Sequence, residues 1–502
     1  MKYLLLILSM LFVSAGCGLE TAQNSDVVKL SVNGVLEFPS EGGEQIFSVS
    51  AVNPLELQPE SDWIAVEKVK KTGDVTTVKV IADRNDSPSQ RSTRISVSAG
   101  GDAKYVEVSQ AAASPSVGGE VILPEGSLAS VLPEFMGMGW NLGNHFDAYN
   151  NGIAGETAWG NPAATQETFN KVRAAGFKSV RIPVTWLGKV GGAPNYKVSE
   201  AWLNRIAEVV GYAENAGLVA IINIHHDGAD SKYWLDIINA AKDDAVHQRI
   251  LDQVGAMWTQ IAEKFKDKGE FLIFEGFNEI HDGKWGWGTN RTDGGKQYKC
   301  LNEWNQAFVN AVRATGGNNA ERILGVPAYC TNTDLAIEAF VMPEDTANDR
   351  LMISVHCYDP SEYTLTARYS EWGHTAASSK KAPGNNESDL KKVFEKLHNN
   401  FISKNIPVYM GEFGCVNRAS LRDQSFQQYY LKYYAKLSKT YGVPCILWDN
   451  GAKGAGNERH AFIDHATGEY CSPEAKAAVE ALLGSYNSSL TLDEVYNAAP
   501  KN

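Results

Sequence analysis

Eight short apolar runs alternate with longer segments of helical periodicity between residues 122 and 485, and this alternation limits the possible folds more than any other feature. Apolar runs separated by amphipathic helical segments predict βα units whose strands lie parallel in one sheet. Eight consecutive units are typical of a closed (β/α)8 TIM barrel, so we expect an α/β fold here. The expected strands are 136–140, 178–183, 218–224, 271–277, 322–328, 351–357, 406–411 and 443–448, and helical patterns cover, for example, 167–175, 201–216 and 248–266.

An open, doubly wound sheet is the alternative arrangement of such units. It would place a Gly-rich phosphate-binding turn between the first strand and the helix that follows it. The run from Gly137 to Asn144 (GMGWNLGN) instead has its glycines within and just after the expected strand. The barrel is therefore favoured.

The N-terminal part of the chain has a different pattern of apolar and polar residues. Residues 26–112 contain short runs in which apolar and polar residues alternate, separated by Gly, Asn, Asp and Ser, and this pattern predicts a small all-β, immunoglobulin-like sandwich. Residues 113–121 are mostly small and include Pro and Gly, as expected of a linker to the barrel domain at 122–485. The polar C-terminal tail, 486–502, is expected to pack loosely.

The first residues are typical of an export signal. Lys2 precedes an apolar run over 3–13, which is shorter than the roughly 20 residues that a membrane span needs. The run SAGC at 14–17 resembles a bacterial lipobox, which implies a lipoprotein whose signal peptide is 1–16 and whose lipid is attached to Cys17. An ordinary secretory signal with an incidental cysteine is the alternative.

The net charge excludes some classes of partner, and the cysteines indicate the thiol state. The net charge of −13 argues against nucleic acid or an anionic membrane surface as the main partner. Besides Cys17 there are six cysteines, for which about 15 full pairings exist, and their spacing selects none. Cys357, Cys415 and Cys445 lie inside apolar runs, which favours buried free thiols. Because the sequence has neither a CxxC motif nor a His-rich spacing, we expect no metal. We also expect no cofactor, and we expect the protein to be a monomer.

Two of the expected strands lead into a glutamate. The runs 274–279 (FEGFNE) and 409–414 (YMGEFG) bring Glu279 and Glu412 to the ends of strands four and seven. A carboxylate in apolar surroundings costs several kcal/mol unless it is paired or protonated. Strands four and seven lie across a barrel from each other, so the two carboxylates can face each other. A facing pair about 5 Å apart is what retaining glycoside hydrolysis requires.

Polar and aromatic residues recur at the other expected strand ends, where the catalytic groups of a barrel lie. Strand five, which ends near Ala328 and Tyr329, adds nothing clear. The residues at the other ends are Asn144 and Asp147 (strand one), Arg181 (two), His225 and His226 (three), Asn278 (four), His356 and Tyr358 (six) and Trp448 (eight).

This set, and above all Asn278-Glu279 with Glu412, resembles glycoside hydrolase family 5, a retaining family on the (β/α)8 fold. The resemblance implies that Glu279 is the acid/base and Glu412 the nucleophile. It further implies that Asn278 binds the sugar 2-hydroxyl and that Arg181 keeps Glu412 ionised. His225, His356, Tyr358 and Trp448 would surround the sugar at the cleavage point, with Trp448 as its floor. His226 either contacts substrate or braces His225.

The run GWNLGN at 139–144 and the His-His-Asp run at 225–227 resemble subfamily 4 in particular, which cuts β-1,4-glucans and xyloglucan. In that subfamily a threonine often follows the asparagine at position 144. This chain has His145 there, which changes the contacts near that subsite.

Aromatic residues in the expected strand-end loops indicate an extended binding surface. Trp285 and Trp287 stand in a Gly-rich loop with little apolar sequence around them, so we interpret them as sugar platforms, with loop packing as the alternative. Further subsites are expected from other loop aromatics. These are Trp186, Trp234, Tyr363 and Trp372. A long open surface favours an endo-acting enzyme on a polymer.

The N-terminal module resembles the BACON domain. The resemblance is carried by 61–64 (SDWI), 94–97 (RISV) and 106–110 (VEVSQ). Trp63 is either a sugar platform or part of the sandwich core, and the core is favoured because the module has few other aromatic residues to form a sugar-binding face. A spacer role is therefore expected.

We expect a retaining endo-β-1,4-glucanase whose partner is a β-glucan polysaccharide. Xyloglucan is the first choice, because a BACON domain joined to a subfamily 4 barrel resembles endo-xyloglucanases of bacterial glycan-utilisation systems. Cellulose or mixed-linkage glucan comes second and mannan third. A non-catalytic surface glycan-binding protein is a rival of another class, but it would have lost one glutamate. Because polymers do not cross an outer membrane, the lipid anchor is expected to hold the enzyme on that membrane, facing the cell surface.

Overall fold

The computed structural model describes residues 28–32, 34–39, 42–83, 85, 90–111 and 119–501. The chain divides into two compact units, 1–115 and 116–502. The signal peptide, Cys17 and most of the expected linker lie outside the described residues. Among the helices that are described, none combines the length and apolar character needed to span a bilayer.

The N-terminal unit is a sandwich of two four-stranded sheets. Along β6, and along β7 from Ile95 onward, every second residue is buried, as alternating sequences predict. Trp63 is half-buried and packs against this core, and the Arg91 guanidinium lies 4.3 Å from the centre of its ring. One sheet is β1 (Lys29–Leu30), β3 (Gly43–Ser50), β6 (Val75–Ala82) and β5 (Ile64–Thr72), and the other is β2 (Val35–Phe38), β8 (Asp102–Gln110), β7 (Arg91–Ala99) and β4 (Glu56–Pro59).

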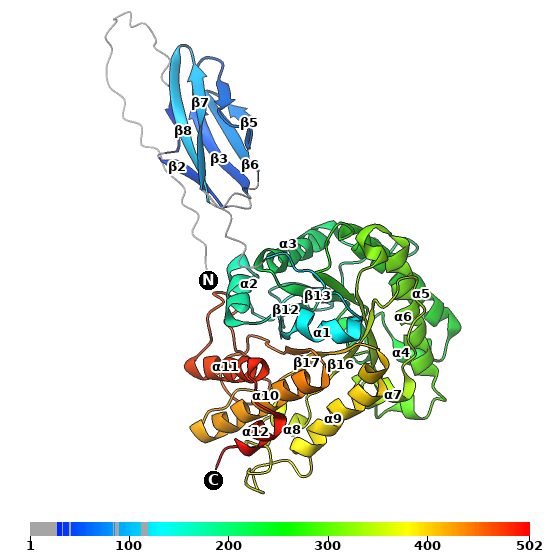
Figure 1. The fold of residues 1–502 in the computed structure, drawn as a ribbon. Coiled ribbons are helices and arrows are strands. Elements are labelled where there is room, and N and C mark those ends of the chain that lie inside the picture. Colours follow the sequence, from blue (N-terminus) through cyan, green and yellow to red (C-terminus); the bar gives the residue numbers. More distant parts are fainter. Residues whose placement is uncertain are drawn as a thin grey trace, which may run out of the picture. The chain divides into compact units, whose positions relative to one another are not determined.

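The second unit is a closed barrel of eight parallel strands surrounded by helices (Figure 1), which confirms the predicted fold. Every barrel strand overlaps one of the eight apolar runs expected from the sequence. In barrel order they are β9 (Met138–Asn141), β12 (Ser179–Ile182), β13 (Val219–Asn223), β14 (Leu272–Glu275), β15 (Leu324–Asn332), β16 (Leu351–His356), β17 (Val408–Phe413) and β18 (Cys445–Leu447). Of these, β9, β15 and β17 extend beyond the expected ends.

The main helices begin and end at local sequence signals. For example, Ser199 caps the start of α3 by accepting a hydrogen bond from the Trp202 amide, and Gly217, at φ 67°, ends it. Thr165 and Gly176 bound α2 in the same way. The long helices are α2 (Gln166–Ala175), α3 (Glu200–Ala216), α5 (Asp244–Lys264), α6 (Lys296–Ala314), α9 (Glu387–Asn400), α10 (Leu421–Tyr441) and α11 (Pro473–Asn487).

Short elements complete the loops. They are α1 (Leu128–Met136), β10 (Tyr149–Asn150), β11 (Ile153–Ala154), α4 (Ile237–Ala240), α7 (Thr333–Ala339), α8 (Ser361–Thr364), α12 (Leu492–Asn497), and the 3-10 turns η1 (His226–Ser231), η2 (Thr289–Arg291), η3 (Gly317–Ala320) and η4 (Ile402–Lys404).

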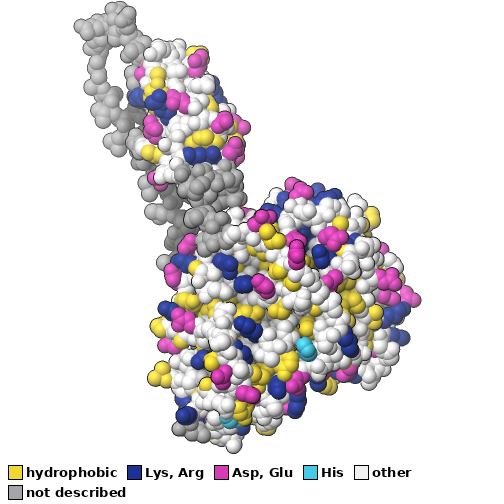
Figure 2. Space-filling view, in the orientation of Figure 1, with side chains coloured by type: hydrophobic (Ala, Val, Ile, Leu, Met, Phe, Trp, Pro, Cys, Tyr) yellow, Lys and Arg dark blue, Asp and Glu magenta, His cyan; other side chains and the backbone are white. Residues whose placement is uncertain are grey.

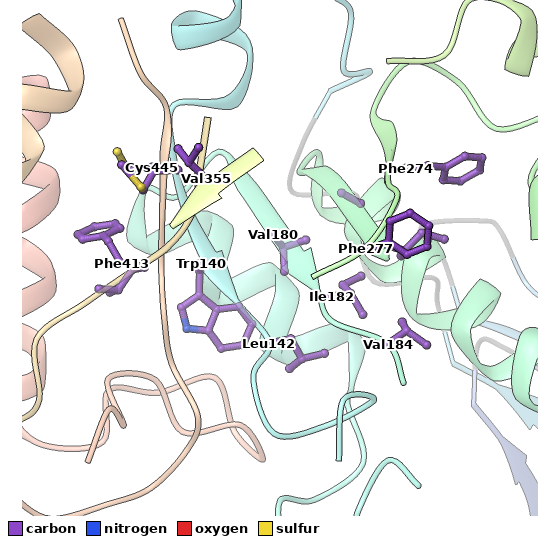
Figure 3. Close-up of a cluster of buried hydrophobic side chains, with 14 of the residues drawn as sticks. Trp140, Leu142, Val180, Ile182, Val184, Phe274, Phe277, Val355, Phe413 and Cys445 are labelled. Carbon is purple, nitrogen blue, oxygen red and sulfur yellow. The ribbon is translucent and has the colours of Figure 1, made fainter. Parts of the chain in front are cut away.

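Apolar side chains fill the space between the strands and the helices (Figure 3), where Trp140, Val180 and Phe274 are fully buried. A separate cluster lies where α1 packs on barrel residues such as Ile221 and Ile446. The barrel strands are buried on both faces, and their sequences are therefore continuous apolar runs. On the face shown in Figure 2, acidic and basic side chains are interspersed.

Two expectations about the periphery can be compared with the structure. The tail does not pack loosely: Thr491 and Glu494 form a capping box that starts α12, and this helix buries Val495.

The described cysteines are all free thiols, five of them buried, which confirms the expectation for Cys357, Cys415 and Cys445.

Candidate active site

The two predicted glutamates meet at the carboxyl ends of the barrel strands. Glu412 lies in β17, and Glu279 follows β14. A carboxylate oxygen of each and a ring nitrogen of His356 all lie within 4.8 Å of one another. His356 Nδ1 is 2.8 Å from Glu279 Oε1 and 3.8 Å from Glu412 Oε2, so this ring sits between the two carboxyl groups.

Glu412 is held by charged and polar donors. Arg181 Nη1 donates to its Oε1 at 2.8 Å, and the Tyr358 hydroxyl donates to its Oε2 at 2.9 Å. His225 Nε2 is 4.0 Å from Oε1. Burial raises the pKa of Glu412, and Arg181 opposes that rise because its positive charge favours the ionised form.

Glu279 has less charged surroundings. Its side chain is 19% exposed, and burial raises its pKa to about 7. Burial also lowers the pKa of His356 to about 4, so the ring is neutral near pH 7 and can donate one hydrogen bond to Glu279 from Nδ1. The carboxyl group of Glu279 is therefore able to hold a proton near neutral pH.

Arg181 connects the site from the end of β12. Its side chain is fully buried. Nη1 donates to Glu412 and, at 3.1 Å, to Asn141 Oδ1, whereas Nη2 donates to Asn278 Oδ1 at 2.8 Å. Nε donates to Glu275 Oε2 at 2.8 Å, so one guanidinium orients the predicted nucleophile, the predicted sugar-binding amide of Asn278 and a further glutamate.

The loop after β9 lies beside this centre. Asn144 has φ 59° and donates its amide to Asp147, which also accepts from the His145 amide at 2.8 Å. Asp147 is completely buried, so it braces this loop, which corrects its expected role as a sugar contact. His226 is half-buried, with Nδ1 3.0 Å from the Asp147 carbonyl oxygen, and its ring packs edge-on to His225.

Trp448 offers a partly exposed ring beside His225. The two rings are parallel within 4°, with centroids 6.4 Å apart. Gly143 lies under the indole: a Cβ at this position would come within 2.9 Å of it. This close approach explains why a glycine is needed there.

Trp285 and Trp287 project from a well-ordered loop. They are 55% and 77% exposed. Asp282 fixes the loop by accepting hydrogen bonds from the Thr289 amide and hydroxyl. Trp285 stacks on His281 with centroids 4.4 Å apart, so its other face is available to a ligand.

Other loop aromatics divide into buried and exposed ones. Trp186, Tyr363 and Trp372 are at most 1% exposed and belong to the core, so the expectation that they line subsites is wrong. Trp234 is half-buried, and its indole nitrogen donates to Asp227.

Sequence reasoning missed an aromatic group around His226. Trp159 is 43% exposed, donates its indole hydrogen to the Tyr149 carbonyl oxygen, and lies 5.5 Å from the His226 ring. Tyr149 packs edge-on to Tyr233. The signal was the run of aromatics between the first strand and its helix.

Two groups of metal-ligating atoms come together among the described residues, namely Asp147, His225 and His226, and Glu279, His356 and Glu412. In the first group, His225 Nδ1 is paired with Asn223, and the Asp147 oxygens accept backbone hydrogen bonds. In the second, Arg181 already neutralises Glu412. Neither set is arranged as a ready cation cage.

The site and fold agree with known proteins. Residues 143–454 match the family described as Cellulase (glycosyl hydrolase family 5), and residues 55–111 match the family BACON, described as "Putative binding domain, N-terminal". The chain is 36% identical over 387 residues to Endoglucanase A of Paenibacillus barcinonensis, covering 74% of this chain and 89% of that relative. It is 31% identical over 506 residues to the xyloglucan-specific endo-beta-1,4-glucanase of Bacteroides ovatus, covering 97% and 96% respectively.

A solved structure, the GH5-4 broad specificity endoglucanase from Bacteroides salanitronis, is 54% identical and has a TM-score of 0.72. It covers 74% of this chain and 98% of its own length. The family match spans most of the barrel, including both glutamates and the residues around them. The chain therefore belongs to glycosyl hydrolase family 5 and is a glycoside hydrolase with an N-terminal BACON domain.

Proposed function

We propose that the protein is a retaining endo-β-1,4-glucanase in which Glu412 is the nucleophile and Glu279 the acid/base. The observation that carries this proposal is the separation of at most 4.8 Å between a carboxylate oxygen of each glutamate. Retaining glycosidases hold their carboxyl groups about 5–5.5 Å apart, whereas inverting ones leave about 6.5–9.5 Å for a water molecule.

In the first step, Glu412 attacks the anomeric carbon and forms a glycosyl ester. Arg181 and Tyr358 keep its oxygens aligned. Glu279, whose pKa is raised to about 7, gives its proton to the leaving oxygen as the glycosidic bond breaks. Asn278, held by Arg181, is positioned to bind the sugar 2-hydroxyl.

In the second step, Glu279 is ionised and acts as a base. It takes a proton from water, the water oxygen attacks the anomeric carbon, and the ester bond to Glu412 breaks. Both carboxyl groups then return to their starting states. The neutral His356 beside Glu279 can hydrogen-bond to it in either state.

Exposed aromatics on several loops support action within a polymer. Trp285 and Trp287 follow β14, and Trp159 follows β9, so stacking surfaces are spread around the two glutamates. A flat indole matches the apolar face of a pyranose ring. Several such surfaces allow a glucan to be bound on both sides of the glycosidic bond that is cut.

Xyloglucan is the substrate that we propose first. The xyloglucan-specific relative aligns with 97% of this chain, so it spans both units. A broad-specificity β-1,4-glucanase, active also on cellulose and mixed-linkage glucan, is the second candidate. It is favoured by the 54% identity to a broad specificity endoglucanase.

The test combines one substitution with three substrates. Glu412→Gln should lower kcat at least about 10³-fold while folding and glucan binding persist, because the amide keeps the shape but cannot form the ester. Glu480→Gln, on the exposed face of α11, is the matched control and should retain full activity. Reducing-end release is compared on xyloglucan, mixed-linkage glucan and carboxymethylcellulose.

A Glu412→Gln enzyme with wild-type activity would refute the assignment of the nucleophile. A kcat/KM at least about 10-fold higher on xyloglucan, equivalent to about 1.4 kcal/mol in transition-state binding, supports a xyloglucanase. Comparable values on all three polymers support the broad-specificity alternative.

A further inference from the structure

A third glutamate lies beneath the reacting pair. Glu275 is the last residue of β14, and its side chain is fully buried. Its carboxylate accepts four hydrogen bonds from four other barrel strands, two on each oxygen. Oε2 accepts from Arg181 Nε at 2.8 Å and Asn223 Nδ2 at 2.7 Å, and Oε1 accepts from Ser354 Oγ at 2.7 Å and the Tyr409 hydroxyl at 2.5 Å.

These donors keep Glu275 ionised. Burial alone would raise its pKa, but Arg181 and the hydrogen bonds hold the pKa of Glu275 below its ordinary value. A buried carboxylate with every lone pair satisfied is a fixed negative charge. The barrel interior at this level therefore contains two carboxylates, Glu275 and Glu412, that share one guanidinium.

Glu275 controls how Arg181 is presented. Because Nε is tied to Glu275, the plane of the guanidinium is fixed, and its two terminal nitrogens point to Glu412 and Asn278. Neither of these residues contacts Glu275 through the hydrogen bonds described above. The influence of Glu275 on them passes through Arg181.

The charge of Glu275 also acts on both reacting carboxyl groups. It partly neutralises Arg181, which weakens the pull of that cation on Glu412, and its own field opposes ionisation of Glu279. The titratable or charged groups around it are Arg181 on β12, His356 on β16, Tyr409 and Glu412 on β17, and Glu279 after β14.

We propose that Glu275 is a positioning residue of this active site, which clamps Arg181 against Glu412 and Asn278 and whose fixed negative charge sets the pH range in which the enzyme works. This inference rests on the proposed roles of Glu279 and Glu412.

Glu275→Gln removes the charge with little change of shape. The amide oxygen can still accept from Arg181 and Asn223, and the amide NH2 can donate to Ser354 and Tyr409, because hydroxyl groups also accept hydrogen bonds. Loss of a nearby anion lowers the pKa of both Glu412 and Glu279. Both limbs of the pH profile of kcat/KM should therefore move to lower pH, by about one unit.

Tyr409→Phe is the matched control. It deletes one buried hydrogen bond to Glu275 but leaves the carboxylate charge and its contact with Arg181 in place. This variant should lose thermal stability while the two limbs of its pH profile stay where they are in the wild type. A shift equal to that of Glu275→Gln would show that disturbed packing, not charge, moves the limbs, and would overturn the proposal.

The measurement is kcat/KM on an aryl β-cellobioside across the pH range for the full chain and both variants. If the Glu275→Gln enzyme loses activity but the two limbs of its pH profile stay at the wild-type positions, the residue is only structural and the proposal fails. If the wild type shows no bell-shaped profile, or Glu412→Gln is active, the proposed function fails instead.

Discussion

At the scale of single residues, two buried glutamates differ in the charges they face. Glu412 accepts hydrogen bonds from a guanidinium and a phenol, whereas Glu279 lies beside a neutral imidazole. Burial raises the pKa of Glu279 to about 7. It also raises the pKa of Glu412, but there Arg181 counteracts burial. The pair consequently shares one proton over the working pH range.

This difference predicts the pH dependence of the enzyme. Activity should rise with pH as Glu412 ionises and fall as pH passes about 7, because Glu279 then loses the proton that the leaving group needs. Glu279→Gln should abolish this alkaline limb. It should also lower kcat/KM about 10²–10⁴-fold on poor leaving groups, with a much smaller loss on activated aryl glycosides.

The measurement is a pH series of kcat/KM on two aryl cellobiosides that differ in leaving-group pKa. An alkaline limb near 7 that persists in the Glu279→Gln enzyme would assign that titration to another group. Equal losses on both substrates would argue against Glu279 as the acid.

Sequence reasoning found the glutamates that close the apolar runs and missed Glu275, which lies within one of these runs. Glu279 and Glu412 stood out because each closes an apolar run. Glu275 lies within the same run as Glu279, but its partners come from four other strands. Those partners are brought together only by closure of the barrel, which a linear pattern does not encode.

At the scale of elements, β17 combines the proposed nucleophile, Glu412, with a glycine that the site needs. A Cβ on Gly411 would come within 2.8 Å of His356 Nε2 and 3.3 Å of Ser354 Oγ. The glycine thus makes room for the histidine that lies between the two carboxyl groups. Glu412 is its neighbour in the chain, so the strand cannot shift to relieve a clash without moving the carboxylate that we propose as the nucleophile.

Gly411→Ala should therefore damage both activity and stability. We expect a loss of about 1–3 kcal/mol in the free energy of unfolding from overpacking, together with a fall of at least about 10-fold in kcat/KM as His356 is displaced. The measurements are thermal unfolding and kcat/KM on the same preparation.

Gly255→Ala in α5 is the control, because a Cβ there meets nothing within 4 Å. In a helix interior this change should stabilise the protein by up to about 1 kcal/mol and leave kcat unchanged. A Gly411→Ala enzyme with wild-type kcat/KM would show that His356 tolerates displacement.

The strands were predictable because both faces of each are buried, which makes them continuous apolar runs. The irregular end of β15 was not predictable from the sequence. Its register shifts between Pro327 and Asn332, and Cys330 and Thr331 adopt φ angles of 57° and 46°. A β-branched residue such as Thr331 rarely adopts a positive φ, so its backbone preference argues against a turn at this position. Yet in this turn the Thr331 hydroxyl donates to the Cys330 carbonyl oxygen, and Thr331 lowers the pKa of Glu279 against the larger effect of burial.

At the scale of the whole molecule, the chain consists of two units with separate cores. The sandwich core is built around residues such as Val49 and Val97, and the barrel core around residues such as Trp258 and Phe308. Composition and periodicity were sufficient to separate these units. The packing of α12 was not predictable, because it depends on a few apolar residues in a polar tail.

Deletion of residues 1–115 should leave the catalytic unit intact. We expect the truncated enzyme to keep its kcat on a soluble oligosaccharide and the thermal transition of the barrel, because each unit buries its own core. Calorimetry and oligosaccharide kinetics on both forms provide the measurement. A large fall in barrel stability or in kcat would show that the sandwich supports the active site directly.

The buried free thiols described above have different consequences in the folded and in the opened chain. Five of the six described cysteines are buried, so they are out of reach of oxidants and alkylating reagents while the chain is folded. No described cystine has to form before the barrel can close, and none can be reduced to loosen it. Once the chain opens, however, the same sulfur atoms are exposed together. Any modification at that moment would add bulk that the closed barrel has no room for, and a transient opening would become permanent.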